Sequence, residues 1–164
     1  MILCNAIKQR TSTRLYDKKK NVDYNTIYNC IEAAINAPSP HNEQPWIFRI
    51  ITSAETIKLL ANHLNNNRWL RTASAIVVIG TEKKNSIEKS KVYLAIGAAI
   101  ENMLLEAEER GVGTCWIGEC LGKSMEEMLN WPAQYEIVSM VAMGYKRING
   151  TKKIHKKSVE EVLV

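Results

Sequence analysis

Residues 73–80 read Ala-Ser-Ala-Ile-Val-Val-Ile-Gly, a nearly unbroken apolar run. Such a run is typical of a strand covered on both faces, because a strand with one wet face alternates apolar and polar residues. The run is far too short to cross a bilayer. The rest of the chain must therefore supply elements that cover both faces of a central sheet.

Helical and strand patterns alternate along the rest of the chain. Asp23 can cap a helix that begins at Tyr24, and Gly111 ends a long helical pattern where a C-cap belongs. Thr52 with Glu55 matches a capping box. The predicted helices cover residues 24–36, 52–63, 88–110 and 124–129, and the predicted strands cover 46–51, 73–80, 113–118 and 137–145, with 159–164 as a terminal strand or arm. This order predicts an α+β layer fold with helices packed on a central sheet.

The composition is that of one ordinary globular domain. The chain has 164 residues, 46% of them apolar, and contains no repeat, low-complexity tract or linker. We therefore expect a single domain over residues 1–164. Residues 1–5 lack the features of a secretory signal, and no stretch is long enough for a membrane span. The expectation is a soluble, cytoplasmic protein with no membrane partner.

Cysteine and charge patterns narrow the function classes. The four cysteines are scattered without a C-x-x-C pair, and the three histidines are not spaced to complete a zinc site. We expect neither a metal nor a disulfide. The net charge of +5 reflects basic runs such as 18–20 and 152–157. These runs are solvated faces or part of a site for a phosphate-bearing ligand, and nucleic acid is not expected because interleaved aromatic residues are missing.

Residues 10–14, Arg-Thr-Ser-Thr-Arg, place two guanidinium groups around three hydroxyl residues after a short N-terminal helix. Arginine binds phosphate oxygens bidentately, and hydroxyl groups can bind the oxygens that remain. The cluster therefore suits a phosphate monoester. The alternative is a solvated helix end in which a serine or threonine acts as a cap.

Residues 38–46, Pro-Ser-Pro-His-Asn-Glu-Gln-Pro-Trp, form a stiff polar loop that runs into an apolar strand. Ligand contacts concentrate on loops of this kind. Asn42 and Gln44 can read the donors and acceptors of a planar heterocycle. The alternative is a structural turn, in which His41 is a surface residue.

Residues 111–119, Gly-Val-Gly-Thr-Cys-Trp-Ile-Gly-Glu, leave the long helix. The glycines allow the backbone to approach a ligand closely, and Trp116 could lie beside an aromatic ring. The segment is no dinucleotide fingerprint, because that motif follows a strand and opens a helix. Read alone, it is a helix end followed by a buried strand.

Taken in order, these segments resemble the nitroreductase family of FMN-dependent oxidoreductases. They read R-x-S-x-R at residues 10–14, A-P-S-x-x-N-x-Q-P-W at 37–46, N-M-L-L-x-A-x-x-x-G-x-G-T-C-W-I-G at 102–118, and G-Y at 144–145. The resemblance covers nearly the whole chain. It implies an α+β fold with a central mixed sheet flanked by helices, an interlocked homodimer, and FMN in the groove between the subunits.

The resemblance also implies which residues bind the cofactor. The FMN phosphate and ribityl chain would be held by Arg10, Thr11, Ser12 and Arg14. The loop that reaches the flavin from the partner subunit would carry Ser39, Pro40 and Asn42, with Pro38 and Gln44 beside them. The isoalloxazine would lie along Trp116, Ile117, Gly118 and Glu119, and a basic residue, Lys156 or Lys157, would complete the phosphate site. The flavin N5 carries the chemistry, so no catalytic side chain is predicted.

The reaction implied by the resemblance is ping-pong. NADH or NADPH gives hydride to the flavin, and a nitroaromatic, a quinone or a similar conjugated electrophile then takes it. Other readings stay open: reductive dehalogenation or flavin fragmentation on the same fold, a flavin-binding storage or sensing protein with little turnover, and a basic nucleic-acid-binding domain. Because the chain is shorter than many members, we expect the excursion that often caps the flavin to be reduced.

Overall fold

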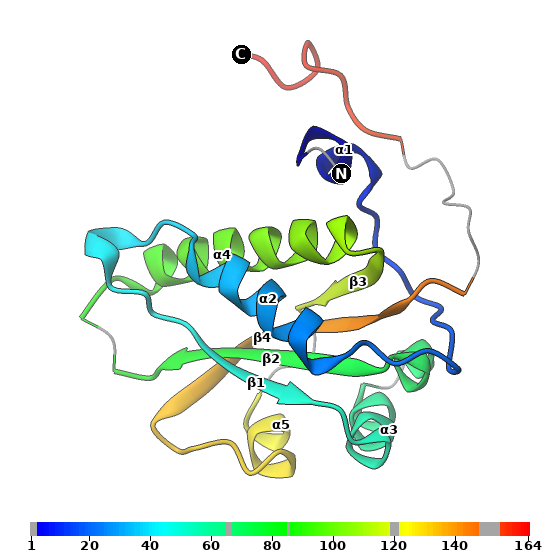
Figure 1. Cartoon of the computed structure of the whole chain (residues 1–164). Coiled ribbons are helices and arrows are strands. Elements are labelled where there is room, and N and C mark those ends of the chain that lie inside the picture. Colours follow the sequence, from blue (N-terminus) through cyan, green and yellow to red (C-terminus); the bar gives the residue numbers. More distant parts are fainter. Residues whose placement is uncertain (1–2, 65–66, 85, 119–121, 148–154) are drawn as a thin grey trace.

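The computed structural model describes residues 3–64, 67–84, 86–118, 122–147 and 155–164 (Figure 1). Its centre is a four-stranded sheet in the order β1-β2-β4-β3. The strands are β1 (Ile47–Ile51), β2 (Ala75–Glu82), β3 (Val112–Ile117) and β4 (Tyr135–Tyr145). All three ladders between them are antiparallel. The strand predicted at 73–80 is β2, displaced by two residues toward the C-terminus.

Helices cover both faces of this sheet (Figure 1). The helices are α1 (Leu3–Gln9), α2 (Tyr24–Ile35), α3 (Ala54–His63), α4 (Lys89–Glu109) and α5 (Lys123–Met128), with short 3-10 helices η1 (Pro40–Asn42) and η2 (Arg68–Thr72). On β2, Val77 and Ile79 belong to the core under α2 and α4. The alternate residues Ile76 and Val78 belong to the core under α3 and α5. The prediction of a central strand covered on both faces is therefore confirmed.

The predicted fold class is also confirmed, since helices and strands form an α+β layered domain. The four named strands pair antiparallel, and a parallel pairing occurs as the bridge between Ser12 and Thr114 beside β3. This bridge joins the segment after α1 to the outer side of β3. The sheet thus extends toward the predicted phosphate cluster.

Helix ends follow from short-range hydrogen bonds. The Asp23 carboxylate accepts from the Thr26 backbone N–H (2.9 Å) and caps α2, as predicted. Gly111, which follows α4, has a φ of +72°, a left-handed conformation that favours glycine. The predicted start of α3 was wrong by one residue. Ser53, and not Thr52, is the N-cap, because its hydroxyl accepts from the Thr56 N–H (3.3 Å).

The last described segment, residues 155–164, forms no strand within this chain and carries exposed aliphatic side chains on Val159, Val162 and Leu163. Of its two predicted forms, a strand or an arm, the arm describes it. None of the helices in the described ranges is both long and apolar enough to cross a membrane.

Candidate functional site

The segment that follows α1 lies along β3 and the end of β4. The backbone N–H of Thr13 donates to the carbonyl of Thr114 (2.7 Å). Farther along, the N–H of Asp17 donates to the carbonyl of Tyr145 (2.8 Å). These bonds fix the cluster at residues 10–14 beside the outer edge of the sheet.

Two glycines let this segment approach the strands closely. A Cβ on Gly113 would lie 2.7 Å from Oγ1 of Thr13, and a Cβ on Gly144 would lie 2.7 Å from a ring carbon of Tyr16. Tyr16 is buried, and its hydroxyl donates to the carbonyl of Ala142 (3.2 Å). The glycines in the family-like motifs therefore have a structural role, which is to admit the segment that carries the arginines.

A small cavity of about 70 Å³ opens between this segment, η2 and the end of β3. Its lining consists of Arg14, Asn67, Trp69, Cys115, Trp116, Ile117 and Gly118. The structure thus brings together Arg14 and the predicted residues 116–118. Asn67 and Trp69 were not predicted as site residues. Their side chains are joined by a hydrogen bond from the Trp69 indole N–H to Oδ1 of Asn67 (3.1 Å).

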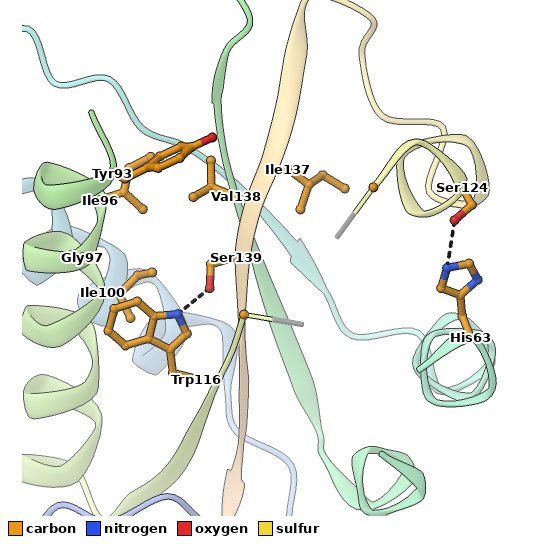
Figure 2. A pocket seen from close by; sticks show the side chains of 12 residues that line it. His63, Tyr93, Ile96, Gly97, Ile100, Trp116, Ser124, Ile137, Val138 and Ser139 are labelled. Atoms are coloured by element: carbon orange, nitrogen blue, oxygen red, sulfur yellow. Dashed lines mark hydrogen bonds between the residues drawn. The ribbon is translucent and has the colours of Figure 1, made fainter. Parts of the chain in front are cut away.

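A larger groove of about 800 Å³ lies on the other side of the β3 end (Figure 2). One wall is the face of α4 with Tyr93, Ile96, Gly97 and Ile100. The floor is β4 with Ile137, Val138 and Ser139, and the far side carries His63 and Ser124. Trp116 and Gly118 line both the groove and the small cavity. The end of β3 is therefore the boundary that the two spaces share.

The Trp116 side chain is held in place although its residue is 43% exposed. Its indole N–H donates to Oγ of Ser139 (2.5 Å), and this hydroxyl donates to the carbonyl of Ile117 (2.9 Å). Ser139 is buried in β4, so the two hydrogen bonds hold the exposed indole ring of Trp116 against the floor of the groove (Figure 2). The groove thus contains a preoriented aromatic surface, which suits contact with a flat ring.

The thiol of Cys115 lies between the cavity and the core. Burial raises the pKa of this thiol, and the Arg14 charge and a hydrogen bond with Ser12 oppose that shift in part. The thiol therefore stays protonated near neutral pH and is a poor nucleophile.

Arg10 turns toward α4 instead of the cavity. Its Nε lies 3.4 Å from Oε1 of Glu101, and its side chain is 20% exposed. Thr11 is half-buried and Ser12 is exposed, so both remain accessible beside Arg10. The two predicted arginines therefore lie at different parts of one face, with Arg14 nearer to Trp116.

The loop at residues 38–44 lies near the N-terminal end of α4, whereas the segment that follows α1 passes its C-terminal end (Figure 1). Its form is set locally, since Oγ of Ser39 accepts from the Gln44 N–H (3.0 Å) and His41, Asn42 and Gln44 all have positive φ. The predicted residues Pro38, Ser39, Pro40, Asn42 and Gln44 are thus not brought to the cavity of the same chain. This placement is compatible with a loop that serves a second copy.

The other predicted residues divide between exposed and undescribed parts of the chain. Lys156 and Lys157 are exposed in the C-terminal segment, which Figure 1 shows apart from the sheet. Glu119 lies outside the described residues. Within one chain, therefore, neither lysine is placed at the cavity.

The arrangement suits part of an aromatic cofactor that carries a phosphate. Arg10 and Arg14 supply positive charge, Asn67 supplies an amide, and Trp116 supplies a flat surface. Among the described residues, no atom lies within 4 Å of the place where a Cβ would stand on Gly118, so on their side the backbone is open to a ligand. The cavity is far below the roughly 300–1,000 Å³ that enclose a small ligand. One chain therefore offers one side of such a site.

Comparison with known proteins gives the same assignment along nearly the whole chain. The model of the nitroreductase family matches residues 7–67 and 58–145. A protein of Archaeoglobus fulgidus, provisionally named NADH dehydrogenase/NAD(P)H nitroreductase, is 32% identical over 146 residues, which are 86% of this chain and 83% of that protein. An iodotyrosine deiodinase of Thermotoga neapolitana is 25% identical over 169 residues, with 88% of each chain covered.

Among solved structures, a provisionally named nitroreductase of Desulfovibrio desulfuricans, crystallised in complex with FMN, superposes with a TM-score of 0.89. It is 29% identical, and the match covers 100% of this chain and 96% of that one. The fold is therefore shared over its full extent with a protein that binds FMN.

Proposed function

This chain belongs to the nitroreductase family, and we propose that it is an FMN-dependent oxidoreductase that uses NADH or NADPH to reduce a conjugated electrophile. One observation carries the proposal. Trp116 and Gly118 line both the cavity beside Arg14 and the 800 Å³ groove, so a flavin along this strand end would face an open substrate space. When bound, the flavin supplies the hydride chemistry, accepting from NAD(P)H and donating to the oxidant.

The side chains around the strand end have distinct tasks in this proposal. Arg14 and Asn67 donate hydrogen bonds to the polar edge of the flavin ring, because they share a cavity with residues 116–118. A cation at that edge favours the anionic reduced ring. Arg10, Thr11 and Ser12 hold the phosphate and ribityl chain. Trp116, fixed by Ser139, orients the ring.

A second copy of the chain would complete the site. The loop at residues 38–44 and the lysines at 156 and 157 do not reach the cavity of their own chain, so in the proposed homodimer they contact the flavin of the other subunit. Exposed apolar side chains support such an interface on α1, α2, α4 and the C-terminal segment. They are Ile7, Tyr24, Tyr28, Ile35, Leu94, Val159, Val162 and Leu163.

The proposed order of events is ping-pong, because NAD(P)H and the oxidant would use the same groove in turn. Nitroaromatics and quinones are the expected oxidants, because Trp116 offers the groove a flat aromatic surface. Initial rates at several fixed oxidant concentrations should give parallel double-reciprocal lines. Intersecting lines would exclude this order.

The direct test is a visible spectrum of the purified protein, followed by anaerobic addition of NADH and then NADPH. Flavin bands that bleach on addition would support both the cofactor and the reductive half-reaction. A protein without flavin that also fails to bind added FMN would refute the proposal.

Arg14→Ala should weaken FMN binding about ten- to hundredfold, since a charge-assisted hydrogen bond is lost. Lys58→Ala, on the exposed side of α3, should leave FMN binding unchanged.

Two other functions would each be favoured by a specific experimental result. The similarity to a deiodinase makes reductive dehalogenation the second candidate. Turnover of halophenols in preference to nitroaromatics and quinones would favour it. A yellow protein that neither donor bleaches would favour flavin storage or sensing.

A further inference from the structure

His63 and Ser124 meet on the side of the groove opposite Trp116 (Figure 2). The serine Oγ lies 3.2 Å from Nε2 of the histidine, across 61 positions of sequence. We propose that this pair binds an anionic oxygen of the oxidant, so that the preferred substrates are flat aromatic acids. The inference rests on the proposed function, and it adds the substrate class and the residues that select it.

The fold places the histidine at the end of a helix beside the groove. His63 is in the last turn of α3 and is half-buried, and an imidazole N–H can donate a hydrogen bond to a ligand oxygen. Ser124 belongs to α5, which lies beside α3 under the same face of the sheet (Figure 1). A ligand oxygen beside this pair can accept from both the imidazole N–H and the serine O–H.

Two carboxylates of this region accept from lysines and not from the His63–Ser124 pair. Glu126 accepts from Lys83 (2.9 Å), and Glu136 accepts from Lys89 (3.0 Å). Among the described residues that line the groove, no aspartate or glutamate is present, and the titratable side chains are His63 and Tyr93. Within the described lining, an incoming carboxylate or phenolate would therefore meet hydrogen-bond donors and no acid.

The rest of the groove selects the body of the ligand. Figure 2 shows Ile96 and Ile100 on the α4 side beside Trp116, and Ile137 between Trp116 and the His63–Ser124 pair. A flat aromatic ring matches the apolar middle, and its reducible group can lie toward Trp116 and Gly118. An anionic group on the opposite end of the ring would then point toward the pair. A neutral ring would fill the middle and leave the polar end to water.

The test compares three ligands with the same ring and the same nitro group. They are 4-nitrobenzoate, 4-nitrobenzamide, which has a neutral substituent of similar size, and nitrobenzene. Dissociation constants are measured by calorimetry on the purified, oxidised protein without NAD(P)H, so that no turnover occurs. We expect 4-nitrobenzoate to bind about ten- to hundredfold more tightly than the amide, as a charge-assisted hydrogen bond provides.

Variants identify the residues responsible. His63→Ala should abolish the preference for the acid and leave nitrobenzene binding unchanged. Ser124→Ala should reduce the preference. The control, Lys58→Ala, removes a positive charge from an exposed position on the same helix. This variant should retain the preference for the acid. Circular dichroism confirms that each variant is folded.

Other results would overturn the inference. Equal affinity of the wild type for the acid and the amide would refute anion selection. A His63→Ala variant that weakens all three ligands equally would show that the histidine shapes the groove without recognising charge. The flavin spectrum is recorded on the same samples. A wild-type protein that holds FMN and is bleached by NAD(P)H, yet shows no preference for the acid, would refute this inference and leave the proposed function intact.

Discussion

Replacing Lys146 by methionine should destabilise the fold strongly, because it would leave a buried carboxylate unpaired. Lys146 Nζ lies 2.8 Å and 2.9 Å from the two carboxylate oxygens of Glu108. The glutamate side chain is 8% exposed and that of the lysine 22%. This bond joins the end of β4 to α4, next to the segment that carries Arg14.

Breaking a buried ion pair on one side costs about 3–5 kcal/mol, since the remaining charge loses its partner without regaining water. For a domain of this size, each kcal/mol lowers the melting temperature by about 2–4 °C. Lys146→Met should therefore lower it by about 6–20 °C in a calorimetric scan. The double change Lys146→Met with Glu108→Leu should recover most of the loss, because no charge then remains buried.

The control is Lys123→Met. Its ion pair with Glu127 is 3.8 Å long and the side chains are 89% and 68% exposed, so its loss should change stability by less than about 0.5 kcal/mol. If Lys146→Met were no more harmful than Lys123→Met, or if the double variant were less stable than the single one, the reasoning from burial would be wrong.

Three further predictions concern the contacts of Gly144, Ser139 and Asp23. Gly144→Ala places a Cβ 2.7 Å from the Tyr16 ring, so urea unfolding should show a loss of about 1–3 kcal/mol from overpacking, and an unchanged midpoint would contradict this close approach. Ser139→Ala removes the acceptor that fixes the Trp116 indole, so FMN or aromatic ligands should bind more weakly by titration while the fold is retained; unaltered affinity would show that the ring needs no fixing. The hydrogen bond from the Thr26 hydroxyl lowers the pKa of the Asp23 carboxyl below its ordinary value near 3.8. The stability that the charged carboxylate gives α2 is therefore present above pH 3.8 and is lost as the pH falls through the lowered pKa. Asp23→Asn should weaken this acid dependence in unfolding curves, and a curve identical to that of the wild type would refute the assignment.

The elements that depend on short-range patterns were predictable from the sequence. The apolar run at 73–80 gave a strand buried on both faces, and the Asp23 cap and Gly111 gave helix ends close to those observed. The start of α3 was misplaced because Thr52 and Ser53 are adjacent hydroxyl residues that can both cap. Only the backbone conformation at Ser53 decides between them.

The composition of the site was less predictable, because it depends on contacts between distant segments. Asn67 and Trp69 lie in a polar stretch with no motif, yet η2 carries them to Arg14 and the end of β3. His63 stands at the end of the helix predicted over residues 52–63 and belongs to no motif. Its distance from Ser124 is a property of how α3 and α5 pack, for which the sequence offers no periodicity or spacing rule.

The positions of the predicted residues bear on the proposal that two chains share the cofactor site. Arg14 and residues 116–118 come together because Gly113 and Gly144 let the segment after α1 lie against β3 and β4. The loop at 38–44 is fixed by its own hydrogen bonds near the N-terminal end of α4 (Figure 1). None of its residues is among the described residues that line the cavity beside Arg14. In a symmetric pair of chains, however, the distant loop of each chain can lie beside the open cavity of the other. The separation within the monomer is thus itself an argument for a cofactor site shared between two copies.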